Sequence, residues 1–261
     1  MQRKNKKIKV LLIIEYNIFY ISEFLTKLIE RKSSLFEISY IFVVKKVKKK
    51  QNINSFLKNN IFNFTILENL CLFSKLFIRV LKIFLFPNTF NIIKIIRNKK
   101  IKYLKIENIL SNYKNIIKEI DPELIVNSSS LYIKKSILKM PKYGCINRHS
   151  SILPAGGGFF PIFYGITYDE PIGTSIHFMS ERIDKGEVII QKKISQRSRN
   201  DSIYDLYQKS FNDSPKLIHK AIEIILRKKE FIKYKGVNPT YRGFPQKKDW
   251  IKFREKKIRW F

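Results

Sequence analysis

The chain has 261 residues, and 44% of them are hydrophobic, which allows a sizeable core and excludes an intrinsically disordered protein. Its 52 lysines and arginines against 21 acidic residues give a formal net charge of +31, which is compatible with a nucleic acid or an anionic membrane as partner. The lysines, however, are spread over the whole length together with isoleucine and asparagine. We therefore favour a general compositional bias over a dedicated polyanion site, and we expect no specific nucleic-acid binding.

The first apolar run begins after a basic start, as in a signal peptide, but covers only Val10 to Ile14 before Glu15 interrupts it. A first core strand is the better interpretation. The two cysteines, Cys71 and Cys145, have no spacing typical of a zinc site or a disulfide framework. These features predict a cytoplasmic protein without a metal site.

The predicted elements alternate between strands and helices along the chain. A buried strand (8–14), a helix (17–31), a second strand (36–44) and a third strand within the stretch EIDPELIVNSSS come first. Two more strands follow within 173–179 and 186–194, and then a helix over 202–227. Asp201 or Ser202 would cap this helix, and Pro215 would kink or break it. The alternation predicts an α/β fold with a mostly parallel, Rossmann-like twisted sheet flanked by helices.

Residues 70–86 repeat apolar side chains at helical spacing and leave a narrow basic face of Lys75, Arg79 and Lys82. The favoured interpretation is a buried helix that ends at Pro87. The alternative is a helix that rests on an anionic membrane surface, so that peripheral membrane contact stays open.

The stretch CINRHSSILPAGGGFFP, residues 145–161, differs in composition from the rest of the chain. If its first residues form a strand, Asn147 and His149 lie two apart and project from the same face. An amide donor and an imidazole aimed at one point suit a reaction in which a carbonyl becomes an oxyanion while a proton moves. The glycines that follow would allow the backbone to approach a ligand closely.

Four motifs with matching spacing over residues 120–195 resemble the folate-dependent formyltransferase family. The family patterns are N-x-H-x-S-L-L-P, G-x-x-P, G-x-T-x-H and D-x-G-x-I-x-x-Q. The matching residues here are Asn147, His149, Ser151, Leu153, Pro154, Gly158, Pro161, Gly173, Ser175, His177, Asp184, Gly186, Ile189 or Ile190, and Gln191. The resemblance implies transfer of a formyl group from N10-formyltetrahydrofolate to a primary amine without metal. It also implies the formyltransferase fold.

Residue roles follow from the same resemblance. The family's catalytic trio matches Asn147, His149 and Asp184, while His177 is expected to support the site. The folate co-substrate is expected at two strand ends, on Ser129, Ser130, Leu131, Tyr132, Ile133, Ser180, Glu181 and Ile183. The amine acceptor is expected at Ser151, Gly158 and Phe160.

Departures from the family guide the choice of acceptor. The segment IIEYNIF after the first strand lacks the glycines of methionyl-tRNA and glycinamide ribonucleotide formyltransferases, and Gly157 stands where the former usually carry arginine. We expect a catalytic domain over 1–227 and a basic, aromatic extension over 228–261, with no room for a C-terminal barrel. The expected acceptor is a nucleotide-linked amino sugar used for surface polysaccharide synthesis. Methionyl-tRNA formylation, formyltetrahydrofolate hydrolysis and a non-catalytic binding module are the alternatives, and a homodimer is possible.

Overall fold

The computed structural model describes residues 6–44, 61–107, 110–195, 198 and 200–261. Its central sheet has seven strands in the order β3-β2-β1-β4-β5-β7-β8, and the first five of these strands are parallel. The strands are β1 (Ile8–Glu15), β2 (Phe36–Val44), β3 (Lys102–Ile106), β4 (Leu124–Ser128), β5 (Cys145–His149), β7 (Gly173–Phe178) and β8 (Val188–Lys193). Strand β7 is antiparallel to both of its neighbours. The predicted Rossmann-like α/β fold is confirmed.

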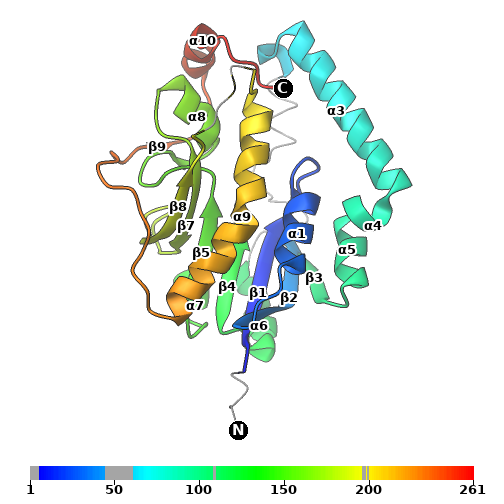
Figure 1. The fold of residues 1–261 in the computed structure, drawn as a ribbon, viewed down its shortest axis with the longest axis vertical. Coiled ribbons are helices and arrows are strands. Elements are labelled where there is room, and N and C mark those ends of the chain that lie inside the picture. The colour runs from blue at the N-terminus through cyan, green and yellow to red at the C-terminus, as the bar shows by residue number, and fades with distance from the viewer. Residues whose placement is uncertain (1–5, 45–60, 108–109, 196–197, 199) are drawn as a thin grey trace.

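Helices cover both faces of the sheet (Figure 1). The face formed by Val10, Leu12 and Ile14 packs against α1 (Ile21–Glu30), α5 (Ile92–Asn98) and α9 (Ile203–Leu226). The opposite face, with Leu11 and Ile13, packs against η2 (Leu110–Tyr113), α6 (Lys114–Ile120) and α7 (Lys135–Leu138). Because successive strand residues point to opposite faces, a continuous apolar run such as β1 is what a strand buried on both sides requires.

Several predicted elements differ from the observed ones in detail. Helix α1 begins at Ile21 instead of residue 17, because the Asn17 side chain accepts hydrogen bonds from the amides of Phe19 and Tyr20. Ser202 is the N-cap of α9, in a capping box with Asp205. The helix continues through Pro215, so the expected break does not occur.

The C-terminal residues pack on the rest of the chain. Strand β9 (Tyr241–Arg242) pairs with β6 (Gly157–Gly158), inside the glycine-rich window. Trp250 and Phe253 of α10 (Lys247–Glu255), together with Trp260, form an aromatic cluster around Phe163 of α8 (Pro161–Thr167). The end of the chain therefore lies beside the segment that carries the predicted site.

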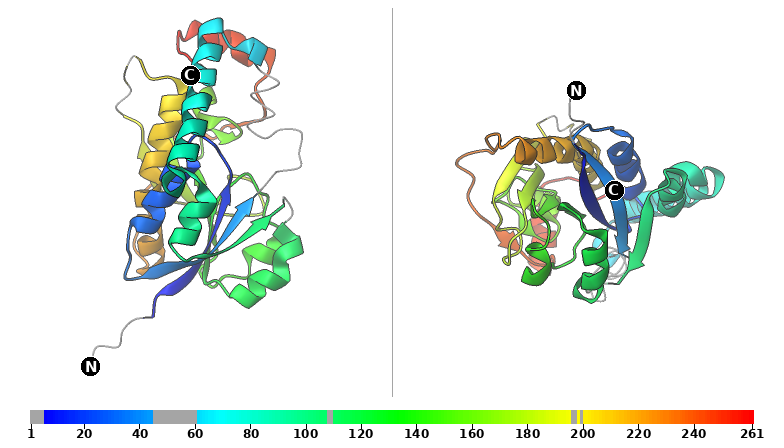
Figure 2. Two further views of the ribbon diagram at one scale, coloured as in Figure 1. Left: turned by 90° about the vertical axis from the view of Figure 1, so that its right-hand side faces the viewer. Right: turned by 90° about the horizontal axis from the view of Figure 1, so that it is seen from below.

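Helix α3 (Ile66–Leu85) contradicts the buried-helix interpretation of residues 70–86. It follows η1 (Ile61–Asn63), leads to α4 (Pro87–Phe90), and forms an outer edge of the molecule that runs from the region of α10 down to α4 (Figures 1 and 2). Phe77 and Phe84 are 70% and 79% exposed, whereas Arg79 is buried. The periodicity correctly predicted a helix, but not which face turns inward. Ion pairs made by Arg79 with Glu23 and by the buried Glu68 with Arg254 hold the polar face against the protein.

Among the described helices, none combines the length and the apolar character needed to cross a membrane.

Candidate active site

Three parallel strands bring their carboxyl ends together at the centre of the sheet. They are β1, β4 and β5, which end at Glu15, Ser128 and His149. The order of the strands reverses between β1 and β4. Strands β2 and β3 extend the sheet on one side of β1, whereas β4 and β5 extend it on the other side. Ligands of open α/β sheets bind outside the carboxyl ends of the strands at such a reversal.

The structure brings the predicted trio into one cluster around a fourth side chain. Asp184 Oδ1 lies 3.7 Å from His149 Nδ1 and also 3.7 Å from His177 Nε2. Asn147 Nδ2 lies 3.3 Å from the same His177 Nε2. Asp184 has a left-handed backbone conformation with φ of 54°, and its Oδ2 accepts a hydrogen bond from the Gly158 amide at 2.9 Å. The glycine-rich segment thus fixes the carboxylate that faces both imidazoles.

Hydrogen bonds to backbone carbonyls assign the protons of the two imidazoles. His149 Nε2 lies 2.8 Å from the Gly156 carbonyl and His177 Nδ1 lies 2.8 Å from the Phe178 carbonyl. A carbonyl only accepts, so each of these nitrogens carries a proton. In the neutral rings, His149 Nδ1 and His177 Nε2 are then the unprotonated nitrogens. His149 therefore directs its basic nitrogen toward the cluster.

Asn127 and His177 fix the amide of Asn147. Asn127 Nδ2 donates to Asn147 Oδ1 at 3.0 Å, and Asn147 Nδ2 donates to His177 Nε2. Of the two protons on Nδ2, one is used by His177 and the other is available to a ligand. Burial, followed by the nearby His149, lowers the pKa of His177 to about 4. His177 is consequently neutral at physiological pH and acts as a fixed acceptor for Asn147.

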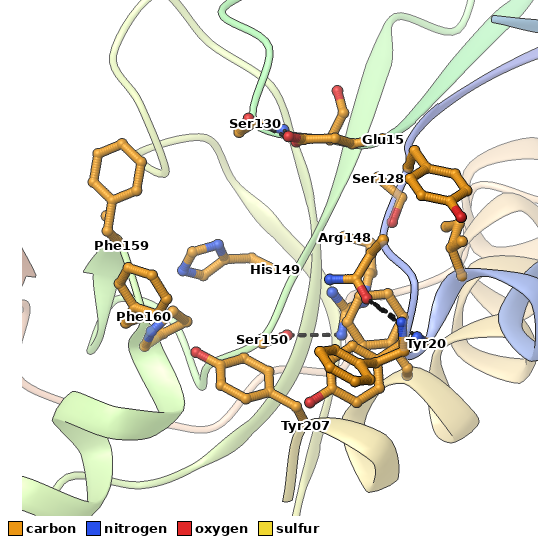
Figure 3. A pocket seen from close by; sticks show the side chains of 18 of the residues that line it. Glu15, Tyr20, Ser128, Ser130, Arg148, His149, Ser150, Phe159, Phe160 and Tyr207 are labelled. Atoms are coloured by element: carbon orange, nitrogen blue, oxygen red, sulfur yellow. Dashed lines mark hydrogen bonds between the residues drawn. The ribbon is translucent and has the colours of Figure 1, made fainter. Parts of the chain in front are cut away.

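Two cavities meet at His149. The larger one, of about 260 Å³, is shown in Figure 3 and extends from Glu15 and Tyr20 to the aromatic side chains Phe159, Phe160, Phe244 and Trp260. The smaller one, of about 140 Å³, extends from Asn127 past the trio to Ser180 and Asp184. Their linings share Ser129, Ser130, Arg148 and His149. A group bound in either cavity can therefore reach the same imidazole.

The residues predicted to bind folate are mostly gathered in the smaller cavity. Seven of the eight line it: Ser129, Ser130, Leu131, Tyr132, Ile133, Ser180 and Ile183. Glu181 does not, since it forms a 2.7 Å ion pair with Lys135 in which both side chains are more than half exposed. Two backbone amides within residues 129–133 already have hydrogen-bond partners. The Ser130 amide donates to the Glu15 carboxylate at 2.9 Å, and the Leu131 amide donates to Ser129 Oγ at 3.3 Å.

The residues predicted to bind the acceptor are divided in the structure. Gly158 and Phe160 line the larger cavity, but Ser151 is absent from both linings. Ser151 is buried, and its carbonyl accepts a hydrogen bond from Ser175 Oγ at 2.7 Å. Ser151 therefore occupies a structural position between β5 and β7.

Sequence reasoning missed several residues of the site. Asn127 directly follows the apolar run of β4 and is buried, and a buried side-chain amide requires a polar partner nearby. Arg148 lies between the two recognised residues of the N-x-H motif, and its burial had no sequence signal. Phe244 and Trp260 come from the C-terminal segment, and its aromatic composition does not indicate that these side chains line the larger cavity.

A family model and several curated proteins match this sequence. The family model described as Formyl transferase matches residues 8–222. Among curated proteins, a methionyl-tRNA formyltransferase of Ehrlichia ruminantium is 46% identical over 81 residues, which are 30% of this chain and 27% of that protein. The chain thus matches only about a quarter of the length of this relative.

Solved structures show the same fold at low sequence identity. A sugar N-formyltransferase from a Shewanella species has a TM-score of 0.57 and 16% identity, covering 95% of this chain and 87% of that one. Glycinamide ribonucleotide transformylase 1 from Symbiobacterium toebii has a TM-score of 0.59 and 12% identity, covering 87% of this chain and 92% of that one. The family model matches most of the sequence and these structures share the fold, so the chain belongs to the formyl transferase family.

Proposed function

We propose that this chain transfers a formyl group from N10-formyltetrahydrofolate to a primary amine. One observation carries the proposal: His149 lies where two separate cavities meet, beside an amide held in a fixed orientation. A transferase must bring a donor and an acceptor to one point, and the two cavities supply a place for each. Family membership and the folate-side residues in the smaller cavity support the same reaction.

The roles of the trio follow from its hydrogen bonds. The free Nδ2 proton of Asn147 would stabilise the negative charge that grows on the formyl oxygen, and Asn127 and His177 hold this donor in place beforehand. His149 Nδ1 would accept the proton of the attacking amine and return it to the leaving nitrogen. Asp184, 3.7 Å away, would stabilise the imidazolium that forms. The donor molecule supplies the activated one-carbon group.

The residues of the smaller cavity fit a folate co-substrate. Leu131 and Ile133 are buried beside it, whereas Tyr132 and Ile183 are 52% exposed at its rim. The lining combines these apolar side chains with a larger number of polar ones, among them Asn127 and Ser180, and can therefore contact both the ring face and the hydrogen-bonding edge of a flat heterocycle. The hydroxyls of Ser129 and Ser130 lie at its junction with the larger cavity.

The proposed acceptor is an amino sugar linked to a nucleotide, as used in surface polysaccharide synthesis. Four aromatic side chains of the larger cavity, Phe159, Phe160, Phe244 and Trp260, offer ring faces for stacking a base or a sugar. The segment after β1 forms an Asn17-centred turn without glycine. Methionyl-tRNA is the competing acceptor, because it appears in the names of curated relatives, and water would make the enzyme a hydrolase.

The acceptor is tested by incubating the protein with N10-formyltetrahydrofolate and a panel of amines. We expect tetrahydrofolate release, and a product 28 Da heavier than the acceptor, only with an amino sugar carried on a nucleoside diphosphate. Binding to tRNA should weaken steeply with salt and should not depend on the attached amino acid, as in counterion release without readout. Efficient formylation of methionyl-tRNA at physiological salt contradicts the sugar assignment, and release without any amine indicates hydrolysis.

We also propose that α3 rests on an anionic membrane surface. Its outward side carries Leu70, Phe73, Phe77, Val80 and Phe84, each at least 56% exposed. Residues 45–100 contain thirteen lysines and arginines against a single acidic residue, Glu68. An apolar helix face within a segment whose sequence is strongly basic matches the cytoplasmic leaflet, whose surface is negatively charged. The cytoplasmic location is part of this proposal, and the unpaired thiols of Cys71 and Cys145 support it.

Vesicle binding tests the membrane proposal. We expect the protein to sediment with vesicles of phosphatidylcholine and phosphatidylglycerol but not with phosphatidylcholine alone. Phe84→Glu should weaken this binding about ten-fold or more, because burial of a phenylalanine is lost. Ile251→Glu, an exposed apolar residue on α10 with 58% exposure, is the matched control and should bind normally. A vesicle-free dimer that Phe84→Glu dissociates would instead assign this face to a second copy of the chain.

A further inference from the structure

Arg148 is a buried cation held only by neutral groups. It lies between Asn147 and His149 on β5, so its side chain projects from the opposite face of the strand, toward α9. Its Nε donates to Ser214 Oγ at 2.8 Å, and its Nη2 donates to Ser150 Oγ at 2.7 Å and Ser210 Oγ at 2.8 Å. The guanidinium also lies 3.7 Å from the centre of the Phe211 ring.

No carboxylate compensates this charge in the part of the chain that the structure describes. Arg148 is 9% exposed and forms no ion pair with any described residue. The one acid that lines the same cavity, Glu15, accepts hydrogen bonds from the amide and the hydroxyl of Ser130 at 2.9 and 2.7 Å. Burial lowers the pKa of Arg148 to about 9, so the site disfavours the charge. A buried charge without a partner is costly, and an anion would offset that cost.

The unused donor of Arg148 is available to the larger cavity. Among the described residues, Nη1 has no hydrogen-bond partner. Arg148 lines this cavity together with Tyr20, Tyr207 and Phe160 (Figure 3), at its junction with the smaller one. Of the described residues that line this cavity, Arg148 is the only lysine or arginine, although the chain contains 52 of them. The diffuse positive charge of the surface therefore does not account for a cation at this point.

We propose that Arg148 is the anion subsite of the acceptor cavity and binds a phosphate or carboxylate group of the amine substrate. The inference rests on the proposed formyl transfer only in assigning that cavity to the acceptor. Because Arg148 and His149 both line the larger cavity, an anion at Arg148 and an amine at His149 would belong to one molecule. A planar guanidinium favours such oxyanions, with which it forms charge-assisted hydrogen bonds. Acceptors without an anionic group would then bind poorly.

Direct binding of inorganic pyrophosphate and of malonate tests the subsite without any formyl transfer. We expect wild type to bind at least one of them in calorimetry at 150 mM salt, and the one that binds identifies a phosphate or a carboxylate. Arg148→Met, which keeps an extended apolar side chain, should weaken that binding about ten-fold or more. Arg227→Met removes the same charge from a side chain that is 55% exposed, and should leave binding unchanged. Equal affinity of folded wild type and Arg148→Met would overturn the proposal.

A second measurement uses wild type alone, in case Arg148→Met does not fold. Phenylglyoxal modifies arginine side chains, and peptide mapping by mass spectrometry reports each position separately. Pyrophosphate or malonate should reduce modification of Arg148 several-fold without affecting Arg227. Equal modification of Arg148 with and without both anions would contradict the subsite.

Kinetics then connects the subsite to the reaction. With the amino-sugar nucleotide as acceptor, Arg148→Met should raise the KM for that acceptor about ten-fold while changing the KM for the folate donor less than two-fold. If no amine is formylated but the anion still depends on Arg148, the transferase proposal fails and the subsite stands. If formyl transfer occurs and Arg148→Met leaves the acceptor KM unchanged, the subsite fails and the transferase proposal stands.

Discussion

Replacing His149 by alanine should lower kcat by about 10²- to 10⁴-fold, because the variant loses the group that moves the proton of the amine. Asn147→Ala should lower kcat by about 10²- to 10³-fold, since it removes the donor aimed at the developing oxyanion. The rates are measured as tetrahydrofolate release with saturating donor and with the amine that the acceptor panel identifies. The KM for the donor should change much less than kcat, because Asn147 and His149 are only two of the fifteen residues that line the smaller cavity.

His219→Ala is the matched control for this experiment. His219 is half-buried and contacts the Phe36 ring and the Leu28 carbonyl, far from the trio in the sequence and absent from both cavity linings. It should keep wild-type kcat, while its circular dichroism and that of His149→Ala should show a native fold. A folded His149→Ala protein with kcat within ten-fold of wild type would remove His149 from the proposed chemistry.

The strands of the sheet could be predicted where the sequence contained long apolar runs. Strands β1, β2 and β4 contain consecutive buried residues that point to both faces of the sheet, and the resulting apolar runs predict strands. Strand β3 was missed because it lies at the edge of the sheet, where Lys102 and Lys105 are exposed and the apolar run is broken. The two-residue pairing of β6 with β9 was missed too, since it joins segments more than eighty residues apart.

The orientation of α3 could not be read from its periodicity. Hydrophobic spacing defines a stripe, and a stripe is normally assumed to face the core. Here the few polar residues decide the orientation instead. Glu68 receives hydrogen bonds from Arg254 and the Trp260 amide, and Arg79 binds the Ile18 carbonyl and Glu23. These contacts join residues far apart in the sequence, so only the folded structure shows them.

The candidate site was predictable to the extent that its motifs are local. Asn147 and His149 share one strand face because they lie two residues apart, and this follows from strand geometry alone. The contacts that orient them come from elsewhere: Asn127 from β4, His177 from β7 and the Gly156 carbonyl from the loop after β5. The burial of Arg148 depends on Ser210 and Ser214, more than sixty residues later. Side-chain partners at such separations leave no periodic signal.

Gly186 is the position where adding a single carbon should cost the most. A Cβ atom at this residue would lie 1.6 Å from the Phe178 carbonyl oxygen and 2.6 Å from its carbon. Both obstacles are backbone atoms of β7, so no side-chain rotation can relieve the overlap. The same carbonyl accepts the hydrogen bond of His177 Nδ1, and Gly186 lies two residues after Asp184. Displacing either segment would disturb the cluster around His149.

Gly186→Ala should therefore lower the free energy of unfolding by about 3 kcal/mol, at the upper end of the usual cost of overpacking. Urea denaturation followed by circular dichroism measures this change, with Gly243→Ala as the matched control. Gly243 has no atom within 4 Å of its added Cβ and no positive φ, so its variant should stay within about 0.5 kcal/mol of wild type. Because the strain reaches His177 and Asp184, kcat of the folded Gly186→Ala protein should also fall. If both variants were equally stable, the close approach of Gly186 to β7 would be refuted, and with it the rigid link between this loop and the trio.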